Sequence, residues 1–265
     1  MKKVFLLTSL LATLVFTSCK KDKDNGNDNP GGGGGNPGTT KLLKKTTETE
    51  NGVTTVFNFN YDNNKRLTSY ASADGKDKTA FTYDAAGNLT KIEITDEDSK
   101  TVFTYTYANN IPVSGTMKSW EMNGTTVGDL DMDSELTFTV VNGQVTKIVR
   151  LIKGEDAEEN LTLNLALTYT NGNLTKVETT AGSDYAYNAT FTFGDKKSPF
   201  PQLTKYVLDE AGFSLMISSK NDLKTAAYVT PGMGQYGFTN TYTYDASGYP
   251  LTSTDGQATV KYEYQ

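Results

Sequence analysis

The chain has no histidine and a single cysteine, Cys19, among its 265 residues. The lack of histidine excludes catalytic triads that use an imidazole base, and it excludes zinc and haem sites that use a histidine ligand. Basic residues are also scarce, with 25 Lys and Arg against 31 Asp and Glu. The resulting negative charge opposes contact with a phosphate backbone, so we expect no nucleic-acid partner.

Long hydrophobic runs are lacking too, and the main apolar stretch lies at the N-terminus. Residues 1–18 place Lys2 and Lys3 before a mostly apolar run from 4 to 16, which is too short to span a bilayer and is typical of a secretory signal. Cys19 follows directly, and the stretch VFTSC resembles a bacterial lipobox. The resemblance implies cleavage before Cys19 and lipidation of its thiol and new amino group. No free thiol would then remain as a nucleophile.

Residues 19–40 have the composition of a disordered tether. They contain no large apolar residue and are rich in glycine, so burial cannot order them. A flexible coil of this length reaches about 26 Å. The run KKDKD at 20–24 resembles the export tag of surface lipoproteins in Bacteroides-like bacteria. We therefore expect an outer-membrane lipoprotein at the cell surface, held by its lipid, with the periplasmic face as the alternative.

Residues 41–265 are built from a recurring segment, of which FTYDAAGNLTKIEIT at 81–95 is the clearest copy. Related segments begin at Phe59, Phe138, Leu167 and Tyr242. Each alternates aromatic or aliphatic residues with Thr or Asn, passes through Asp, Asn or Gly, and resumes the alternation. This period of two predicts β-hairpins with one buried face and one solvated face.

The turns between these strands have recognisable chemistry. Asn-Gly pairs at 51, 123, 142 and 171 predict tight hairpin turns, because both residues tolerate a positive φ. In the longer loops, Gly87 and Gly248 are expected to supply the left-handed position. Asp84 and Asp245 are expected to accept hydrogen bonds from nearby main-chain amides.

These features predict an all-β domain over 41–265: an antiparallel meander of roughly 16 to 18 strands, closed or flattened into a soluble barrel, with little helix. A β-sandwich is the alternative to a closed barrel. One helical turn is expected over 203–208. The interior of such a barrel is wide, so the walls must flatten or loops must fill it. The aromatic face is expected inside, because the other face carries charged residues such as Lys91 and Glu93, and each Lys or Arg facing lipid near the bilayer midplane would cost about 2–4 kcal/mol.

A family resemblance rests on particular segments. The C-terminal run YTYDASGYPLTSTDGQATVKYEYQ, together with KSPF at 197–200 and SSKNDL at 218–223, resembles Bacteroides-type lipoproteins of unknown function that have a porin-like β fold. The resemblance implies a fold and a location and brings no active site. The Tyr-Asp pairs at 61–62, 83–84 and 244–245 also resemble the tyrosine-aspartate repeats of Rhs-type proteins.

Two sets of residues are candidates for ligand binding. Asp129, Asp131 and Asp133 alternate in GDLDMDSE, and three such carboxylates can bind Ca²⁺; a solvated acidic edge is the alternative reading. Trp120, the only tryptophan, can belong to a platform on which sugars stack, or it can pack against neighbouring strands.

No catalytic constellation is recognisable in the sequence, and no cofactor is expected; a calcium ion at Asp129, Asp131 and Asp133 is the one alternative. We therefore expect a non-catalytic, membrane-tethered envelope lipoprotein that binds a glycan, a peptide or an envelope protein. A hydrolase at the cell surface that uses carboxylates or Ca²⁺ is the alternative, since such chemistry does not need histidine. The sequence does not indicate an oligomeric state.

Overall fold

The structure, a computed structural model, describes residues 41–179, 187–209, 212–230 and 234–265. Residues Lys41–Gln265 form one compact unit of 17 strands, one short α-helix and one turn of 3-10 helix. The strands are β1 (Leu43–Glu50), β2 (Val53–Tyr61), β3 (Leu67–Ser72), β4 (Lys78–Tyr83), β5 (Leu89–Thr95), β6 (Ser99–Ala108), β7 (Ile111–Asn123), β8 (Thr126–Val141), β9 (Gln144–Ile152), β10 (Leu161–Thr170), β11 (Asn173–Thr179), β12 (Asn188–Lys197), β13 (Asn221–Thr230), β14 (Gly234–Thr239), β15 (Thr241–Tyr244), β16 (Pro250–Thr254) and β17 (Ala258–Tyr264). The helices are η1 (Ala157–Glu159) and α1 (Phe213–Ser218).

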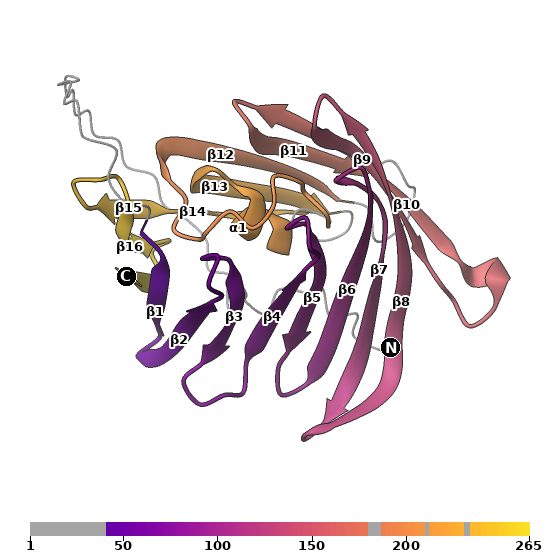
Figure 1. Cartoon of the computed structure of the whole chain (residues 1–265), viewed down its shortest axis with the longest axis horizontal. Coiled ribbons are helices and arrows are strands. Elements are labelled where there is room, and N and C mark those ends of the chain that lie inside the picture. The colour runs from indigo at the N-terminus through magenta and orange to yellow at the C-terminus, as the bar shows by residue number, and fades with distance from the viewer. Residues whose placement is uncertain (1–40, 180–186, 210–211, 231–233) are drawn as a thin grey trace. The chain divides into compact units, whose positions relative to one another are not determined.

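The strands form a nearly closed antiparallel barrel (Figure 1). Most pair with their neighbours along the chain, and β1 pairs with both β2 and β17, which joins the two ends of the sheet. A single residue, Asn240, separates β14 from β15; β14 pairs with β13, and β15 pairs with β16. β14 and β15 therefore follow each other along a single position in the sheet, between β13 and β16. Counted in this way, the 17 strands fill an even number of positions, as a fully antiparallel ring requires. The predicted all-β barrel is confirmed.

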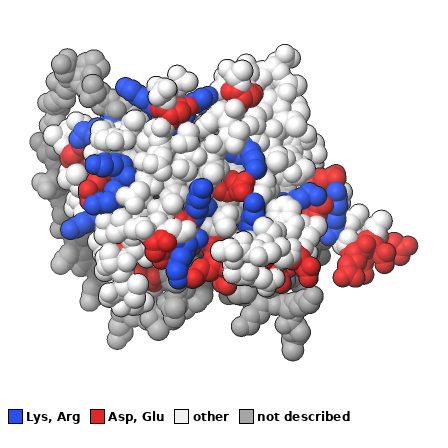
Figure 2. Space-filling view, turned by 60° about the horizontal axis from the view of Figure 1, so that its bottom comes forward, with Lys and Arg blue, Asp and Glu red and all other residues white. Residues whose placement is uncertain are grey.

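The aromatic face of the sheet lies inside the barrel. Phe57, Phe59 and Tyr105 are buried, and Tyr107 is half-buried with its hydroxyl bonded to a main-chain carbonyl. The outer wall carries ion pairs such as Lys176 with Glu178, 2.8 Å apart. Figure 2 shows basic and acidic side chains mixed across one face of the molecule. The prediction that the aromatic face of the sheet lies inside and the charged face outside is therefore confirmed.

The interior is filled by the described residues of the connection between β12 and β13, 198–209 and 212–220. The ring of Phe213, at the start of α1, stacks on that of Phe81 with centroids 6.0 Å apart, and Phe200 lies 6.1 Å from Phe59. The connection includes Tyr206, Val207, Leu208, Leu215 and Ile217, all of which are buried. The prediction that a loop fills the barrel is thus met.

The prediction of a helical turn over 203–208 is wrong. The helix is α1, at Phe213–Ser218, and residues 203–208 run beside it without helical structure. The main-chain N–H of Leu208, which would donate to the carbonyl of Thr204 in a helical turn, donates instead to the hydroxyl of Ser214 at 3.0 Å. This partner from the helix replaces the local hydrogen bond that a helical turn would need.

The turns follow the predicted chemistry with one exception. The Asn and Gly of three Asn-Gly pairs have positive φ, at residues 51–52, 142–143 and 171–172. In the fourth pair only Gly124 does, because Asn123 pairs with Thr126 and the turn consists of Gly124 and Thr125. In the loop after β4, Asp84 accepts a hydrogen bond from the main-chain N–H of Asn88 at 2.8 Å, as predicted.

Each hairpin of the repeat contains a β-bulge just after its turn. Tyr83 pairs with Leu89 whereas Thr82 pairs with Lys91, so Thr90 is the extra residue. The hydroxyl of Thr90 donates to the carbonyl of Thr82 at 3.2 Å, which explains why threonine follows leucine in the repeat. The bulge turns the leucine into the core and sends the following lysine to the outer wall.

Alternation of strand direction gives the barrel two ends. We call one the Lys41 end; it carries Lys41, the turns 62–66, 84–88 and 245–249, and the connection 198–220. The opposite end carries the turns 73–77, 96–98, 153–160 and 255–257. Main-chain hydrogen bonds between Leu42 and Gln265, of 3.0 and 2.8 Å, place the last residue at the Lys41 end as well.

Candidate functional site

A hollow in the outer wall contains the predicted ligand residue Trp120. It has a volume of about 150 Å³. It is lined by Lys91, Glu93, Lys100, Val102, Trp120 and Val127, and we call it the Trp120 hollow. The structure thus surrounds the tryptophan with charged groups that the sequence analysis did not connect with it.

Strand alternation and register bring these residues together. Lys91 and Glu93 flank the buried Ile92 on β5, so both side chains lie on the outer wall. Lys100 of β6 pairs across the sheet with Trp120 of β7. Four strands therefore contribute to the hollow, and a shift of one residue in any of them would turn its contribution inward.

Glu93 is held between two lysines. Its Oε1 lies 2.8 Å from Lys100 Nζ and its Oε2 lies 2.5 Å from Lys91 Nζ. Hydrogen bonds from Lys100 and then from Lys91 lower the pKa of Glu93 to about 2. The carboxylate is therefore ionised at neutral pH, so it can accept hydrogen bonds and cannot donate a proton as a general acid.

The mixture of groups suits a ligand with both polar and apolar surface. The indole of Trp120 and the side chains of Val102 and Val127 offer apolar contact, and the Lys-Glu-Lys group beside them offers donors and acceptors. Small-ligand sites combine an apolar surface with a few placed polar groups in this way. A sugar ring, with an apolar face and hydroxyls at its edge, has the matching chemistry.

The three candidate calcium ligands lie on β8 and do not act as a group. Asp129 and Asp131 are exposed, whereas Asp133 lies 3.1 Å from Lys118 Nζ and 3.8 Å from Lys153 Nζ. Within the described parts of residues 41–265, no three His, Cys, Asp or Glu side chains are placed to hold a metal ion. Calcium binding stays a prediction, without a three-carboxylate ligand set to support it.

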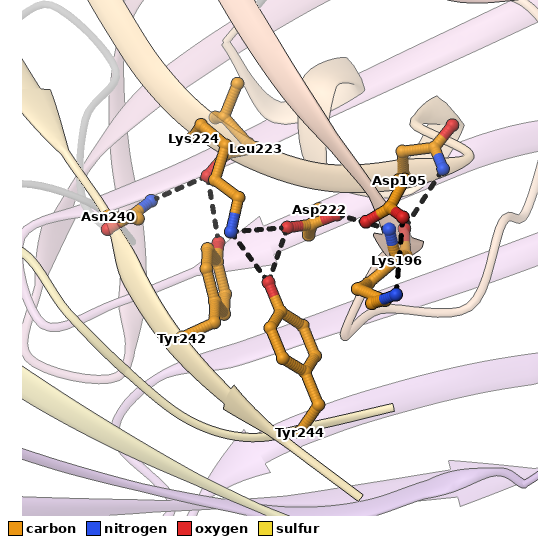
Figure 3. Close-up of polar contacts among 9 residues, drawn as sticks. Asp195, Lys196, Asp222, Leu223, Lys224, Asn240, Tyr242 and Tyr244 are labelled. Atoms are coloured by element: carbon orange, nitrogen blue, oxygen red, sulfur yellow. Dashed lines mark hydrogen bonds and ion pairs between the residues drawn. The ribbon is translucent and has the colours of Figure 1, made fainter. Parts of the chain in front are cut away.

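A buried polar cluster at the junction of β13 and β15 was not foreseen from the sequence (Figure 3). Asp222 has no exposed side-chain surface. Its Oδ2 accepts hydrogen bonds from the Tyr244 hydroxyl at 2.6 Å and from Lys224 Nζ at 2.9 Å, and its Oδ1 accepts one from the main-chain N–H of Lys196 at 3.0 Å. Burial, and then the bond to Asp222, raises the pKa of Tyr244.

This cluster joins two strands where their main-chain pairing ends. Among the described residues, main-chain bonding between β13 and the strand beside it stops at the bond from the N–H of Asn240 to the carbonyl of Lys224, 2.7 Å long. Beyond that point, the Tyr242 hydroxyl donates to the carbonyl of Leu223 at 3.0 Å. Because Asp222 is enclosed and its oxygens are already bonded, we assign the cluster to closure of the barrel rather than to chemistry.

A second cavity, of about 240 Å³, opens at the Lys41 end. It lies between the turns after β4 and β6 and the inserted connection, and its lining includes Asn88, Tyr107, Asn110, Lys205 and Tyr206. Asn88 Nδ2 donates to Asn110 Oδ1 at 2.9 Å, and the Tyr206 hydroxyl donates to the carbonyl of Asn110 at 3.3 Å. These contacts fasten the inserted connection to the rim of the barrel.

The predicted lipid attachment site, Cys19, lies outside the described residues. In the part of the chain that the structure describes, no helix has both the length and the apolar character needed to cross a membrane.

Two solved structures resemble the barrel. A porin-like protein from Bacteroides vulgatus ATCC 8482 matches with a TM-score of 0.54 and 13% sequence identity, over 85% of this chain and 99% of that chain. A porin-like protein from Bacteroides uniformis ATCC 8492 matches with a TM-score of 0.50 and 20% identity, over 84% of this chain and 96% of that chain. The fold is porin-like. At these identities the similarity concerns the fold alone.

Sequence comparison adds a short match. Residues 61–96 match the family model of the RHS repeat, and they contain the loops that begin at Asp62 and Asp84. The match agrees with the predicted resemblance to tyrosine-aspartate repeats and is limited to this part of the chain. No curated protein matches the sequence.

Proposed function

We propose that this protein is a non-catalytic, lipid-anchored β-barrel of the bacterial outer membrane that binds a glycan in the Trp120 hollow. The observation that carries the proposal is the position of the single tryptophan beside an ionised Lys-Glu-Lys group on the outer wall. The lipobox-like sequence around Cys19 supports attachment to a membrane, and the KKDKD run supports location at the cell surface.

The outer wall favours attachment by a lipid over insertion of the barrel itself. Transmembrane barrels carry an outward apolar band, and each Lys or Arg facing the bilayer midplane costs about 2–4 kcal/mol. Here ion pairs such as Lys91 with Glu93 and Lys118 with Asp133 lie along the wall, and phenylalanines such as Phe57, Phe59 and Phe103 face inward. A wall of this kind is suited to water.

The glycan proposal can be tested through Trp120, because the only tryptophan in the chain makes fluorescence specific for the hollow. We expect envelope glycans that bind to change this emission in a saturable manner. Calorimetry should then show a loss of affinity of about tenfold in Trp120→Ala, since an aromatic contact is worth about 0.5–1.5 kcal/mol beyond the area that it buries. Saturable binding that Trp120→Ala leaves unaltered would reject the site.

A matched pair of variants separates the hollow from general charge effects. Lys91→Ala/Glu93→Gln removes the ion pair beside Trp120, and Lys176→Ala/Glu178→Gln removes a similar outer-wall pair on β11 that does not line the hollow. We expect the first variant to lose glycan binding and the second to retain it. Equal losses would indicate non-specific attraction to the wall.

A carboxylate-dependent hydrolase is the second candidate, and one residue favours it. Burial, followed by the nearby Glu50 and Asp255, raises the pKa of Glu48, which is the direction of shift that a general acid needs. Hydrolysis of a glycan substrate that disappears in Glu48→Gln, with folding intact, would replace the non-catalytic proposal. Measurable glycan binding without turnover would support the non-catalytic proposal.

A further inference from the structure

The two ends of the barrel differ in charge. At the opposite end, the described turns hold ten acidic residues and two lysines. These are Asp74, Asp77, Asp96, Glu97, Asp98, Glu155, Asp156, Glu158, Glu159 and Asp255, with Lys76 and Lys153. Such an end is repelled by an anionic surface.

The Lys41 end is balanced and carries accessible cations. Its turns, the inserted connection and the first described residue hold five cations, Lys41, Lys65, Arg66, Lys205 and Lys220, and four described acids, Asp62, Asp84, Asp209 and Asp245. Two of these acids are neutralised locally, Asp62 by Arg66 at 2.8 Å and Asp245 by Lys41 at 2.5 Å. Lys65, Lys205 and Lys220 are exposed, as is Lys44 near the start of β1.

Tyrosines accompany these cations. Every cation–π contact among the described residues lies at or near the Lys41 end: Lys41 and Lys197 over Tyr249, Arg66 over Tyr83, Lys205 over Tyr206, and Lys224 over Tyr242 and Tyr244. Tyr206 and Tyr249 are buried, so their rings position the lysine side chains and do not themselves reach a lipid surface. Lysine, with an apolar stem and a charged head, suits a membrane–water interface.

From this asymmetry we propose that the Lys41 end rests on an anionic lipid surface while the acidic end faces away from it. The inference rests on the proposed lipid attachment at Cys19, because residues 19–40 connect the anchor to Lys41, and a flexible coil of that length has an r.m.s. end-to-end distance of about 26 Å. The charges then select one orientation among those that the tether permits, since each lysine near an anionic leaflet contributes about 1 kcal/mol.

The orientation has a consequence for the proposed ligand site. Trp120 is close to Asn123, where β7 ends at the opposite end, so the Trp120 hollow is held away from the lipid and open to solution. The cavity of about 240 Å³ at the Lys41 end instead faces the headgroups.

The experiment couples the mature chain to vesicles through its only thiol. The protein used begins at Cys19, and its thiol reacts with a maleimide lipid. One set of vesicles contains phosphatidylcholine alone, and the other contains about one third phosphatidylglycerol as well. Lysine acetylation is then followed by mass spectrometry. In the anionic vesicles we expect Lys44, Lys65, Lys205 and Lys220 to react about fivefold more slowly, with Lys76 and Lys78 unaffected. Equal protection at both ends, or none, would overturn the proposal.

Two charge reversals provide the control. Lys65→Glu/Lys220→Glu should return Lys44 and Lys205 to their rates on neutral vesicles, whereas Lys76→Glu/Lys78→Glu at the opposite end should leave the protection intact. If both variants behave alike, the orientation does not depend on the Lys41 end. Coupling through maleimide does not depend on natural lipidation, and glycan binding is read separately by Trp120 fluorescence. Failure of the orientation and failure of the proposed function therefore give different results.

Discussion

The hydroxyl of Tyr83 donates a hydrogen bond of 2.8 Å to the main-chain carbonyl of Leu67 on the neighbouring strand. Main-chain pairing of β3 with β4 ends at Ser69 and Ala80, because the bulge after the preceding turn separates the strands. The phenol thus takes the place of the missing main-chain donor. The same bond recurs from Tyr61 to Leu43, Tyr107 to Leu89, Tyr169 to Val145 and Tyr264 to Pro250.

Removing one of these hydroxyls should weaken the barrel by about 1 kcal/mol, the net value of a typical hydrogen bond. We expect Tyr83→Phe and Tyr169→Phe to lower the free energy of unfolding by this amount in urea titrations. Because the two sites are on different hairpins without shared partners, the double variant should show the sum. A loss below about 0.3 kcal/mol for either variant would mean that water replaces the phenol.

The cluster around Asp222 should behave as a coupled unit. Asp222→Ala leaves Lys224 and Tyr244 without their acceptor, and we expect a loss of about 2–4 kcal/mol, reduced from that of a fully buried pair because Lys224 is partly exposed. Tyr244→Phe in the Asp222→Ala background should cost less than in the wild type. Strict additivity in this double-mutant cycle, measured by denaturant unfolding, would contradict the coupling.

Gly194 is required by the same cluster. A methyl group there would lie 2.5 Å from Asp222 Oδ2 and 2.6 Å from its Oδ1, so Gly194→Ala must displace the carboxylate. We expect a loss of about 1–3 kcal/mol, typical of overpacking. Gly212→Ala is the matched control, because a methyl group at Gly212 meets no atom within 4 Å. Equal melting temperatures for the two variants would refute the steric argument.

Glu48 should make stability fall as the pH rises. Its pKa is raised above the ordinary 4.5, chiefly by burial, so the folded state keeps the proton to a higher pH than the unfolded chain. This contribution is present below pH 4.5 and is lost as the pH rises through the folded pKa. Glu48→Gln should therefore raise the melting temperature relative to the wild type at pH 7 and change it little at pH 4.

Calcium should not stabilise the protein. Asp133 is already paired with Lys118, and among the residues that the structure describes no three His, Cys, Asp or Glu side chains are placed to hold a metal ion, so we expect the same melting temperature with calcium and with a chelator. A rise that increases with calcium concentration, and that is absent in Asp129→Asn/Asp131→Asn/Asp133→Asn, would restore the calcium hypothesis.

Much of the fold could be predicted because it depends on neighbours in the chain. Alternation of Phe57 and Phe59 with asparagine indicates a strand with one buried face, and the Asn-Gly pairs indicate turns, since φ preferences are local. The Asn123-Gly124 turn was displaced by one residue because pairing between β7 and β8, not the dipeptide, decides which residues form the turn. The helix was misplaced for a similar reason: burial inside the barrel, and not local periodicity, orders the connection from 198 to 220.

The sequence alone determined the β class, the positions of most hairpin turns and the inward aromatic face, because each follows from side-chain preferences within a few residues. It also identified Trp120 as a candidate ligand residue. Only the register of the paired strands decided that Lys91, Glu93 and Lys100 surround Trp120 and that Asp222 meets Tyr244. Alternation of strand direction decided that acidic turns gather at one end. These relationships join residues far apart in the chain, and their geometry exists only once every strand has found its register.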